Sequence, residues 1–247
     1  MTATAISAML FKPEPTKFFD GLAPAALYRL MAWFSPAFPV GAYSYSSGVE
    51  WAVEAGDITD ADSLKRWLSV MLTMGGGFCD AVLLVHSHRA VAENDADLLL
   101  EVVELAAAFA PTKERFVETT TQGRAFLATL RSAWPCDALD RLGKISDGVF
   151  AMPVVVGVAG AGHVIPVGAT VHAYLQAFAA NLISAGVRLI PIGQTDGQRL
   201  IAALELKIAA TADRALAAGL DDIATCAFRV DLASMHHETQ YTRLFRS

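Results

Sequence analysis

The sequence is poor in charged residues. Lys and Arg number 19 and Asp and Glu number 25 among 247 residues, so charged side chains make up 18% and the net charge is −6. Soluble proteins commonly carry about 25% charged residues. There is no long basic run and no basic stripe interleaved with aromatic side chains. Because binding to DNA or RNA depends on neutralising phosphates, this composition argues against a nucleic-acid-binding protein.

Cysteine is also scarce. The chain has three cysteines, Cys79, Cys136 and Cys226, which are far apart and odd in number. No Cys-x-x-Cys pair occurs, so neither a disulfide framework nor a zinc site of that type is expected. The first residues lack the positively charged start of a signal peptide. Together these features predict a protein of the reducing cytoplasm.

The sequence signatures of several enzyme classes are absent. The chain contains no GxxxxGK[ST] phosphate loop, no HExxH zinc motif and no glycine-rich dinucleotide fingerprint. The glycine in residues 41–45 is misplaced for a GxSxG nucleophile elbow. A hydrolase that uses Ser44 or Ser46 is therefore the least favoured hypothesis, and we expect a non-catalytic protein.

Apolar residues are abundant: AVILMFWYC account for 54% of the chain, and residues 148–187 carry no Asp, Glu, Lys or Arg. This stretch is long enough for a transmembrane helix of about 20 residues. It is interrupted by Pro153 and Pro166, and its second half carries His172, Gln176 and Asn181. We therefore favour two buried helices, in a core or at a subunit interface, over a membrane-associated helical protein.

Apolar residues recur mainly at helical spacing, so the predicted fold is all-α, a single bundle-like domain of about nine or ten helices. A capping box at Thr59 and Asp62 opens a helix that residues 75–77 end. Further helices are expected over residues 79–92, after Asn94 and Asp95 until Pro111, and from a Thr112 cap to residue 132. Two more are expected over 195–218 and 224–239. The only strand candidate is the apolar run 154–156.

Three segments stand out from this helical background. Residues 35–50, SPAFPVGAYSYSSGVE, combine two prolines and two glycines with a helix start at Ser46 or Ser47. Residues 188–198, RLIPIGQTDGQ, form a turn between two expected helices. Residues 236–247, HHETQYTRLFRS, end the chain with cationic and aromatic side chains of the type that anchors interfaces.

His236, His237 and Glu238 are candidate metal ligands, because imidazole and carboxylate groups suit a divalent metal. Neighbouring residues of a helix point about 100° apart. A complete site would therefore need further ligands from elsewhere in the chain or from another subunit, and a surface role for this group stays open. His86 and His88 lie about 200° apart on a helix and are less suited to sharing a metal.

The three segments, in this order, resemble the urease accessory protein UreF family. The resemblance covers about residues 27–247, and the visible departures are small, at Ala42 and Val49. It implies an all-α, dimeric, non-catalytic protein that binds the accessory protein UreD, also called UreH, and the GTPase UreG. It further implies a scaffold that modulates GTP hydrolysis and nickel delivery to apo-urease. No tightly bound cofactor is implied, although nickel could transit.

The resemblance also implies a division of the chain. Residues 1–24 are expected to form a flexible N-terminal arm, 25–235 the UreF-like domain, and 236–247 a partner-binding tail that orders on the UreD-like partner. A direct nickel carrier that uses the C-terminal His pair is the alternative function. The expected partner-binding residues are Ser44, Tyr45, Glu50, Arg188, Gln194, Gln198, Tyr241, Arg243, Leu244, Phe245 and Arg246.

Overall fold

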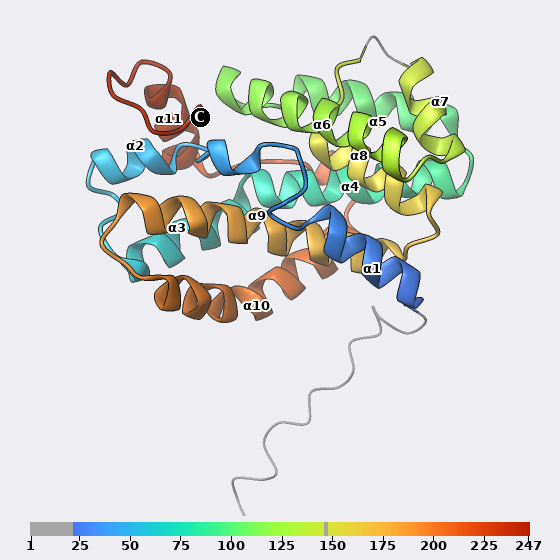
Figure 1. Ribbon diagram of the computed structural model, residues 1–247. Helices are drawn as coiled ribbons and strands as arrows, with labels where there is room; N and C mark the ends of the chain where they lie inside the picture. The colour runs from blue at the N-terminus through green and yellow to red at the C-terminus, as the bar shows by residue number, and fades with distance from the viewer. Residues whose placement is uncertain (1–21, 146–147) are drawn as a thin grey trace, which may run out of the picture.

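The computed structural model describes residues 22–145 and 148–247, and in these residues the fold is all-α, as predicted (Figure 1). The described part contains eleven α-helices, among them a short α2 of six residues, two 3-10 turns and no strand. The elements are α1 (Pro24–Trp33), η1 (Ala42–Ser44), α2 (Val49–Glu54), α3 (Ala61–Met74), α4 (Gly76–Ala92), α5 (Ala96–Ala108), α6 (Lys113–Ala133), α7 (Asp137–Ile145), α8 (Met152–Gly162), α9 (Val167–Leu189), α10 (Gln194–Ala217), η2 (Leu220–Asp222) and α11 (Phe228–His237).

The apolar centre is the contact between α4 and α8. Residues 152–160 of α8 are all buried, and eleven residues of α4 are buried with them. At Gly157 an added Cβ would collide with the Ser87 hydroxyl and the Leu84 carbonyl oxygen, so glycine lets the two backbones approach closely. The expected strand candidate at 154–156 lies inside α8, because a short apolar run also suits a buried helix.

Most expected helix boundaries are confirmed, and one cap is corrected. Thr112 caps α6, as predicted, and α5 begins after Asp95, as expected, with Asp95 as its cap. The cap of α3 is Asp60, not Thr59: the Asp60 carboxylate accepts from the Ser63 backbone N–H at 2.8 Å. In return, the Ser63 hydroxyl accepts from the Asp60 N–H at 3.0 Å, so the box closes on a serine instead of Asp62.

The uncharged stretch 148–187 forms α8 and most of α9, as two largely buried helices. By length and composition, the one described stretch that could cross a membrane is Ala61–Ala92, and 67% of its apolar window is buried within the protein. Gly75 has an extended backbone and divides this stretch into α3 and α4. Neither helix alone reaches the roughly 20 residues that a bilayer requires.

The two expected end segments differ in what the structure describes. Residues 1–21 of the expected N-terminal arm lie outside the described residues, and α1 already begins at Pro24. At the other end, α11 continues to His237, so the division placed after residue 235 falls inside a helix. The residues beyond α11 fold back between α2 and α6 (Figure 1).

Candidate functional site

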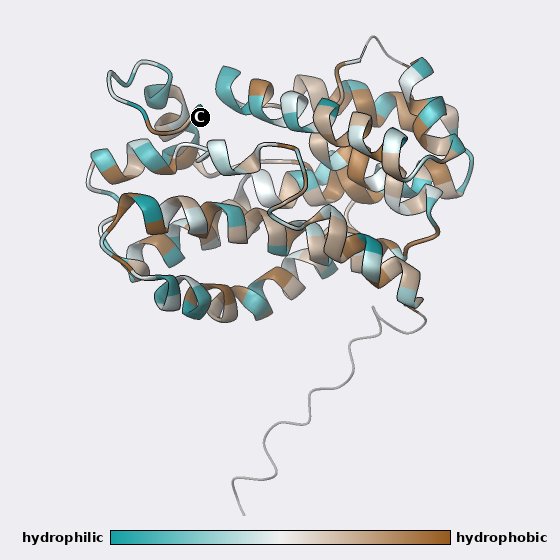
Figure 2. Ribbon diagram, viewed as in Figure 1, coloured by the Kyte–Doolittle hydropathy of each residue, from teal (hydrophilic) through white to brown (hydrophobic). Residues whose placement is uncertain are grey.

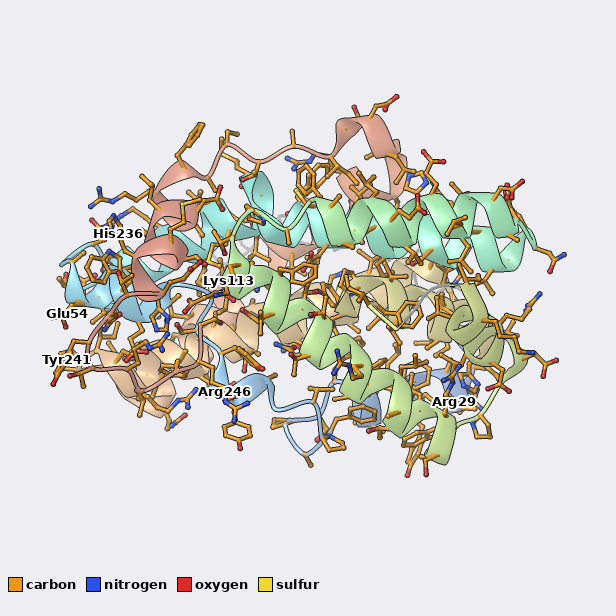
Figure 3. All side chains as sticks on the ribbon, turned by 90° about the horizontal axis from the view of Figure 1, so that it is seen from above. Arg29, Glu54, Lys113, His236, Tyr241 and Arg246 are labelled. Atoms are coloured by element: carbon orange, nitrogen blue, oxygen red, sulfur yellow. The ribbon has the colours of Figure 1, made fainter. Side chains whose placement is uncertain are left out.

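The C-terminal segment lies against the first of the three sequence segments. The Arg246 backbone N–H donates to the Ser44 carbonyl oxygen at 2.8 Å, and the Ser46 N–H donates to the Ser247 carbonyl oxygen at 2.6 Å. Figure 3 shows Tyr241 and Arg246 at the end of the molecule that carries Glu54, far from Arg29. Two segments separated by some 200 residues thus form one surface.

The middle segment joins this surface through Arg188, at the end of α9. The Arg188 guanidinium donates to the Tyr43 carbonyl oxygen at 2.9 Å and lies 4.3 Å from the centre of the Phe245 ring. Gln194 and Gln198 are exposed at the start of α10, and no hydrogen bond links them to the other segments in the described residues. Of the three partner-binding residues expected in this turn, the structure therefore places only Arg188 in contact with the first and last segments.

Glu50 is the acceptor at the centre of the contact. Its two carboxylate oxygens accept from the backbone N–H groups of Leu244 at 2.6 Å and Phe245 at 2.9 Å. Glu50 is placed by α2, whose N-cap Gly48 has a left-handed φ of 83°. A Cβ at Gly48 would lie 2.8 Å from the Ser234 nitrogen, so glycine both permits this turn and lets α2 pack on α11.

His237 joins α11 to two carboxylates and is fully buried. Its Nε2 lies 3.0 Å from a Glu50 oxygen, and its Nδ1 lies 2.8 Å from a Glu114 oxygen on α6. The other Glu114 oxygen accepts from Arg243 at 3.1 Å. Burial raises the pKa of Glu114, and the charges of His237 and Arg243 oppose that rise.

A second charged group lies beside the first and is centred on Arg115 of α6, the residue that follows Glu114. Arg115 donates to Glu118 at 2.8 Å and to the Ser47 hydroxyl at 2.9 Å, and it lies 3.7 Å from Asp80 of α4. Burial raises the pKa of Asp80, whereas Arg115 and a 2.7 Å hydrogen bond from Tyr174 lower it. We call this group and the Glu50–His237–Glu114 group together the polar junction.

A cavity of about 480 Å³ opens beside the polar junction. Residues 33–43 and several residues of α9 line it, and the lining includes aromatic side chains from both segments. Asp80, Arg115 and Glu118 line the same cavity. Most of the first sequence segment thus lines a largely apolar cavity that also has charged groups in its lining.

The expected site residues divide by exposure. Tyr45, Glu50 and Phe245 are buried, so their side chains support the surface from within. Tyr43 is 70% exposed, Leu244 is 63% exposed and Tyr241 is fully exposed. Ser44 contributes through its backbone, since its hydroxyl donates to the Gly41 carbonyl oxygen. Arg243 and Arg246 are exposed, although Arg243 also reaches the buried Glu114.

The structure does not bring His236, His237 and Glu238 together as a metal site within the described residues. Both ring nitrogens of His237 are taken by Glu50 and Glu114, and the His236 ring stacks on Trp51 with 5.0 Å between ring centres. Over residues 22–145 and 148–247, no group of three His, Cys, Asp or Glu side chains is placed to hold a metal ion. Successive residues on α11 point to different surroundings, so a metal site here would need further ligands from elsewhere, as the sequence analysis stated.

The acidic side chains of α6 are the functional residues that the sequence analysis missed. Glu114 and Glu118 lie one turn apart on either side of Arg115, a pattern that usually marks a solvated helix face. The available signal was the position of Glu114 in the first turn after the Thr112 cap. That position does not reveal burial, because the partners of Glu114, His237 and Arg243, come from α11 and the C-terminal segment.

The fold and site define a class of protein: an all-helical one whose first and last segments meet, with an arginine of α9, at a single surface over a buried charged junction. The sequence profile of the UreF family matches residues 58–205. A urease accessory protein UreF of Rhodopseudomonas palustris strain BisB18 is 60% identical over 223 residues, which cover 90% of this chain and 92% of the relative. One of Bradyrhizobium sp. strain BTAi1 is 59% identical over 236 residues, which cover 96% and 98%.

The chain belongs to the UreF family of urease accessory proteins. This family assists the maturation of urease and is not catalytic. The resemblance stated from the three sequence segments is therefore confirmed at the level of the family.

Proposed function

We propose that this protein is a scaffold that binds a UreD-type accessory protein and a UreG-type GTPase during urease maturation. In this proposal, it modulates GTP hydrolysis and the delivery of nickel to apo-urease. Nickel is cargo that transits the assembly. The protein acts in the cytoplasm as a homodimer, and residues 236–247 are its partner-binding tail.

One observation carries this proposal: the segments of the family resemblance converge on one surface. Their buried members fix the surface, whereas Tyr43, Tyr241, Leu244 and Arg246 present side chains outward. Exposed aromatic, arginine and leucine side chains clustered on a fixed backbone are suited to binding another protein. The largely apolar cavity that Tyr43 lines offers a concave complement to a partner's side chains.

The test is co-elution of the purified chain with its UreD and UreG homologues in size-exclusion chromatography. Arg246→Ala and Leu244→Ala are expected to weaken capture of a partner and leave circular dichroism unchanged, since both side chains point outward. Arg66→Ala on α3 is the matched control, because Arg66 is exposed outside this surface. Wild-type chain that elutes apart from both homologues would contradict the proposal.

A second measurement addresses the consequence for urease. The chain is expected to restore nickel-dependent urease activity in a strain that lacks its own UreF, and Arg246→Ala to restore less. Adding the chain and the UreD homologue to UreG is expected to change the rate of GTP hydrolysis. An unchanged rate with the complex formed would remove GTPase modulation from the proposal and keep the scaffold.

A further inference from the structure

The pair formed by Asp80 of α4 and Arg115 of α6 lines two separate cavities. The larger cavity, of about 480 Å³, is the one lined by residues 33–43 and α9. The smaller one, of about 50 Å³, is lined in part by α4, α6 and α11. Asp80 and Arg115 appear in both linings, with 3.7 Å between the guanidinium and a carboxylate oxygen. The pair therefore borders open space and is not enclosed by packed side chains.

Carboxylates outnumber cations around these cavities. Glu118 lines the larger cavity and Asp231 the smaller one, whereas Arg115 is the one Lys or Arg of either lining in the described part of the chain. Three carboxylates thus share one cation. Burial raises the pKa of Asp80 and of Asp231, and Arg115 opposes both rises. A further positive charge at this place would be stabilised by the excess of carboxylates.

Asp80 is the carboxylate that is free to receive such a charge. Glu118 accepts from Arg115 at 2.8 Å and from the Ser47 hydroxyl at 3.1 Å. Asp80 accepts from the Tyr174 hydroxyl at 2.7 Å through Oδ2, and its Oδ1 receives no hydrogen bond from residues 22–145 and 148–247. Because Arg115 already donates to Glu118 and Ser47, an anion would have to displace both of these bonds.

The larger cavity supplies an aromatic lining next to Asp80. Its aromatic members are Trp33, Phe34, Phe38, Tyr43, Tyr174 and Phe178. Aromatic faces attract ammonium and guanidinium groups, and they do so more strongly where water is excluded. The cavity volume also falls within the range of about 300–1,000 Å³ that is typical of small-molecule sites. Lining and size together suit a ligand with an apolar body and one cationic end.

We propose that the larger cavity binds a small organic cation, an ammonium or guanidinium group on an apolar body, with its charge at Asp80 Oδ1 and its body against the aromatic lining. The Asp80 side chain is 15% exposed, whereas Tyr43 in the same lining is 70% exposed. The cation therefore occupies the inner part of the cavity and leaves the outer part to a partner protein. This site goes beyond the proposed function and does not rest on it.

Three probes with similar apolar bodies test the preference for positive charge. 2-Phenylethylammonium, 2-phenylethanol and phenylacetate are titrated into the full chain at pH 7.5 by isothermal titration calorimetry. The ammonium is expected to bind at least about tenfold more tightly than the alcohol, as one charge-assisted bond predicts, and phenylacetate to bind most weakly. No binding of the ammonium, or equal binding of the alcohol or phenylacetate, would overturn the proposal.

A substitution at Asp80 tests where the charge binds. Asp80→Asn removes the charge at nearly constant shape, so it is expected to weaken binding of the ammonium at least about tenfold and to leave binding of the alcohol unchanged. Asp97→Asn, exposed on α5 and outside both linings, is the matched control and should change neither affinity. Wild-type affinity for the ammonium in Asp80→Asn would overturn the role of Asp80.

Filling the cavity tests the location without removing a polar group. Ala177 of α9 lines the larger cavity, and Ala177→Leu adds volume there. This variant is expected to keep its circular dichroism and to lose affinity for the ammonium and the alcohol alike, also if Asp80→Asn does not fold. Ala202→Leu, exposed on α10, is its control and should bind both probes as the wild type does. Wild-type affinities in Ala177→Leu would overturn the location.

Competition separates a free cation from a side chain of a partner. Saturating 2-phenylethylammonium is expected to leave co-elution with the UreD and UreG homologues unchanged. Reduced co-elution would make the occupant a lysine or arginine side chain of a partner and overturn the free ligand. Absence of co-elution without the probe would overturn the proposed scaffold and leave the cation site standing, because the calorimetry uses this chain alone.

Discussion

The α4–α8 contact and the polar junction are both buried, but they are stabilised by different means. At the α4–α8 contact, small and β-branched side chains allow two helices to approach closely, and the polar groups are mostly satisfied within the helices. At the polar junction, carboxylates from α2, α4 and α6 meet arginine and histidine side chains from α6, α11 and the C-terminal segment. Figure 2 accordingly shows more hydrophilic colour over α2, α11 and the C-terminal loop than around α8.

The two regions differ in how their stability responds when a side chain is changed or removed. Apolar packing loses stability in proportion to the volume that is wrongly filled or emptied. A buried charge network loses most when a single member is removed, because the remaining charge has neither water nor a partner. The polar junction is therefore the more fragile region, and it is also the one that fixes the candidate surface.

The largest effect is expected from breaking the polar junction at Arg115. Arg115→Met leaves the buried Glu118 and the largely buried Asp80 without their cation, at a cost of about 4 kcal/mol in the free energy of unfolding. Urea denaturation at pH 7 measures this loss. Arg199→Met, at an exposed pair with Asp196, is the control and should change stability by no more than about 0.5 kcal/mol. Equal losses would mean that burial does not distinguish the two ion pairs.

The α4–α8 contact is expected to respond next, to added volume. Gly157→Ala places a methyl group against Ser87 and the Leu84 carbonyl and should lower the free energy of unfolding by about 3 kcal/mol. Gly76→Ala at the start of α4 is the control: its Cβ would meet only Arg115, at 3.7 Å, so stability should be kept or slightly raised. Similar effects of both variants would show that the helices can move apart freely.

A smaller effect is expected at the edge of the polar junction, where α6 begins. Thr112 caps α6 by accepting from the Arg115 N–H, and its hydroxyl also lies 2.8 Å from that of Ser234. Thr112→Ala should cost about 1.5 kcal/mol, as expected for a cap together with a buried hydrogen bond. Thr195→Ala, exposed in the first turn of α10, should be close to neutral in the same urea titration. A neutral Thr112→Ala would show that water replaces the cap.

The last comparison uses pH on the apolar side of the molecule. Burial lowers the pKa of His88 below its usual 6.5, against the opposing effect of its hydrogen bond to the Ile165 carbonyl oxygen. The unfolded chain then takes up a proton that the folded chain refuses, so stability should fall as pH drops below about 6.5. Urea denaturation at pH 7.5 and 5.5 should show this loss, and His88→Gln should reduce it. An identical slope in His88→Gln would assign the loss to other groups.

Local patterns predicted the helices well where the pattern is complete. Thr112 was recognised as a cap, and the start of α5 was placed correctly after Asp95, because a cap is a contact between residues three apart. The capping box of α3 was placed one residue early, since Thr59 and Asp60 both fit the pattern and only Asp60 has the bonding geometry. The helix α7 was not anticipated: it is short and carries two acidic residues in its first turn, close to Pro135.

The candidate site was predicted in part. Its first and last segments and Arg188 were identified by resemblance, and the structure brings them together. Two expectations stay predictions: that the last residues order on a partner, and that the C-terminal His pair offers metal ligands. In the structure, Glu50 accepts from the N–H groups of Leu244 and Phe245. The two ring nitrogens of His237 lie at hydrogen-bonding distance from Glu50 and Glu114.

The sequence by itself determined the all-helical fold, most helix limits, the burial of the uncharged stretch and the family. These features depend on periodicity, on caps between near neighbours, and on motif order, all of which are written along the chain. Only the tertiary structure decided that Glu50, Glu114 and Arg243 would share one buried junction with His237. Residues from four parts of the chain supply these groups, and whether such charges face water or one another is set by packing between helices.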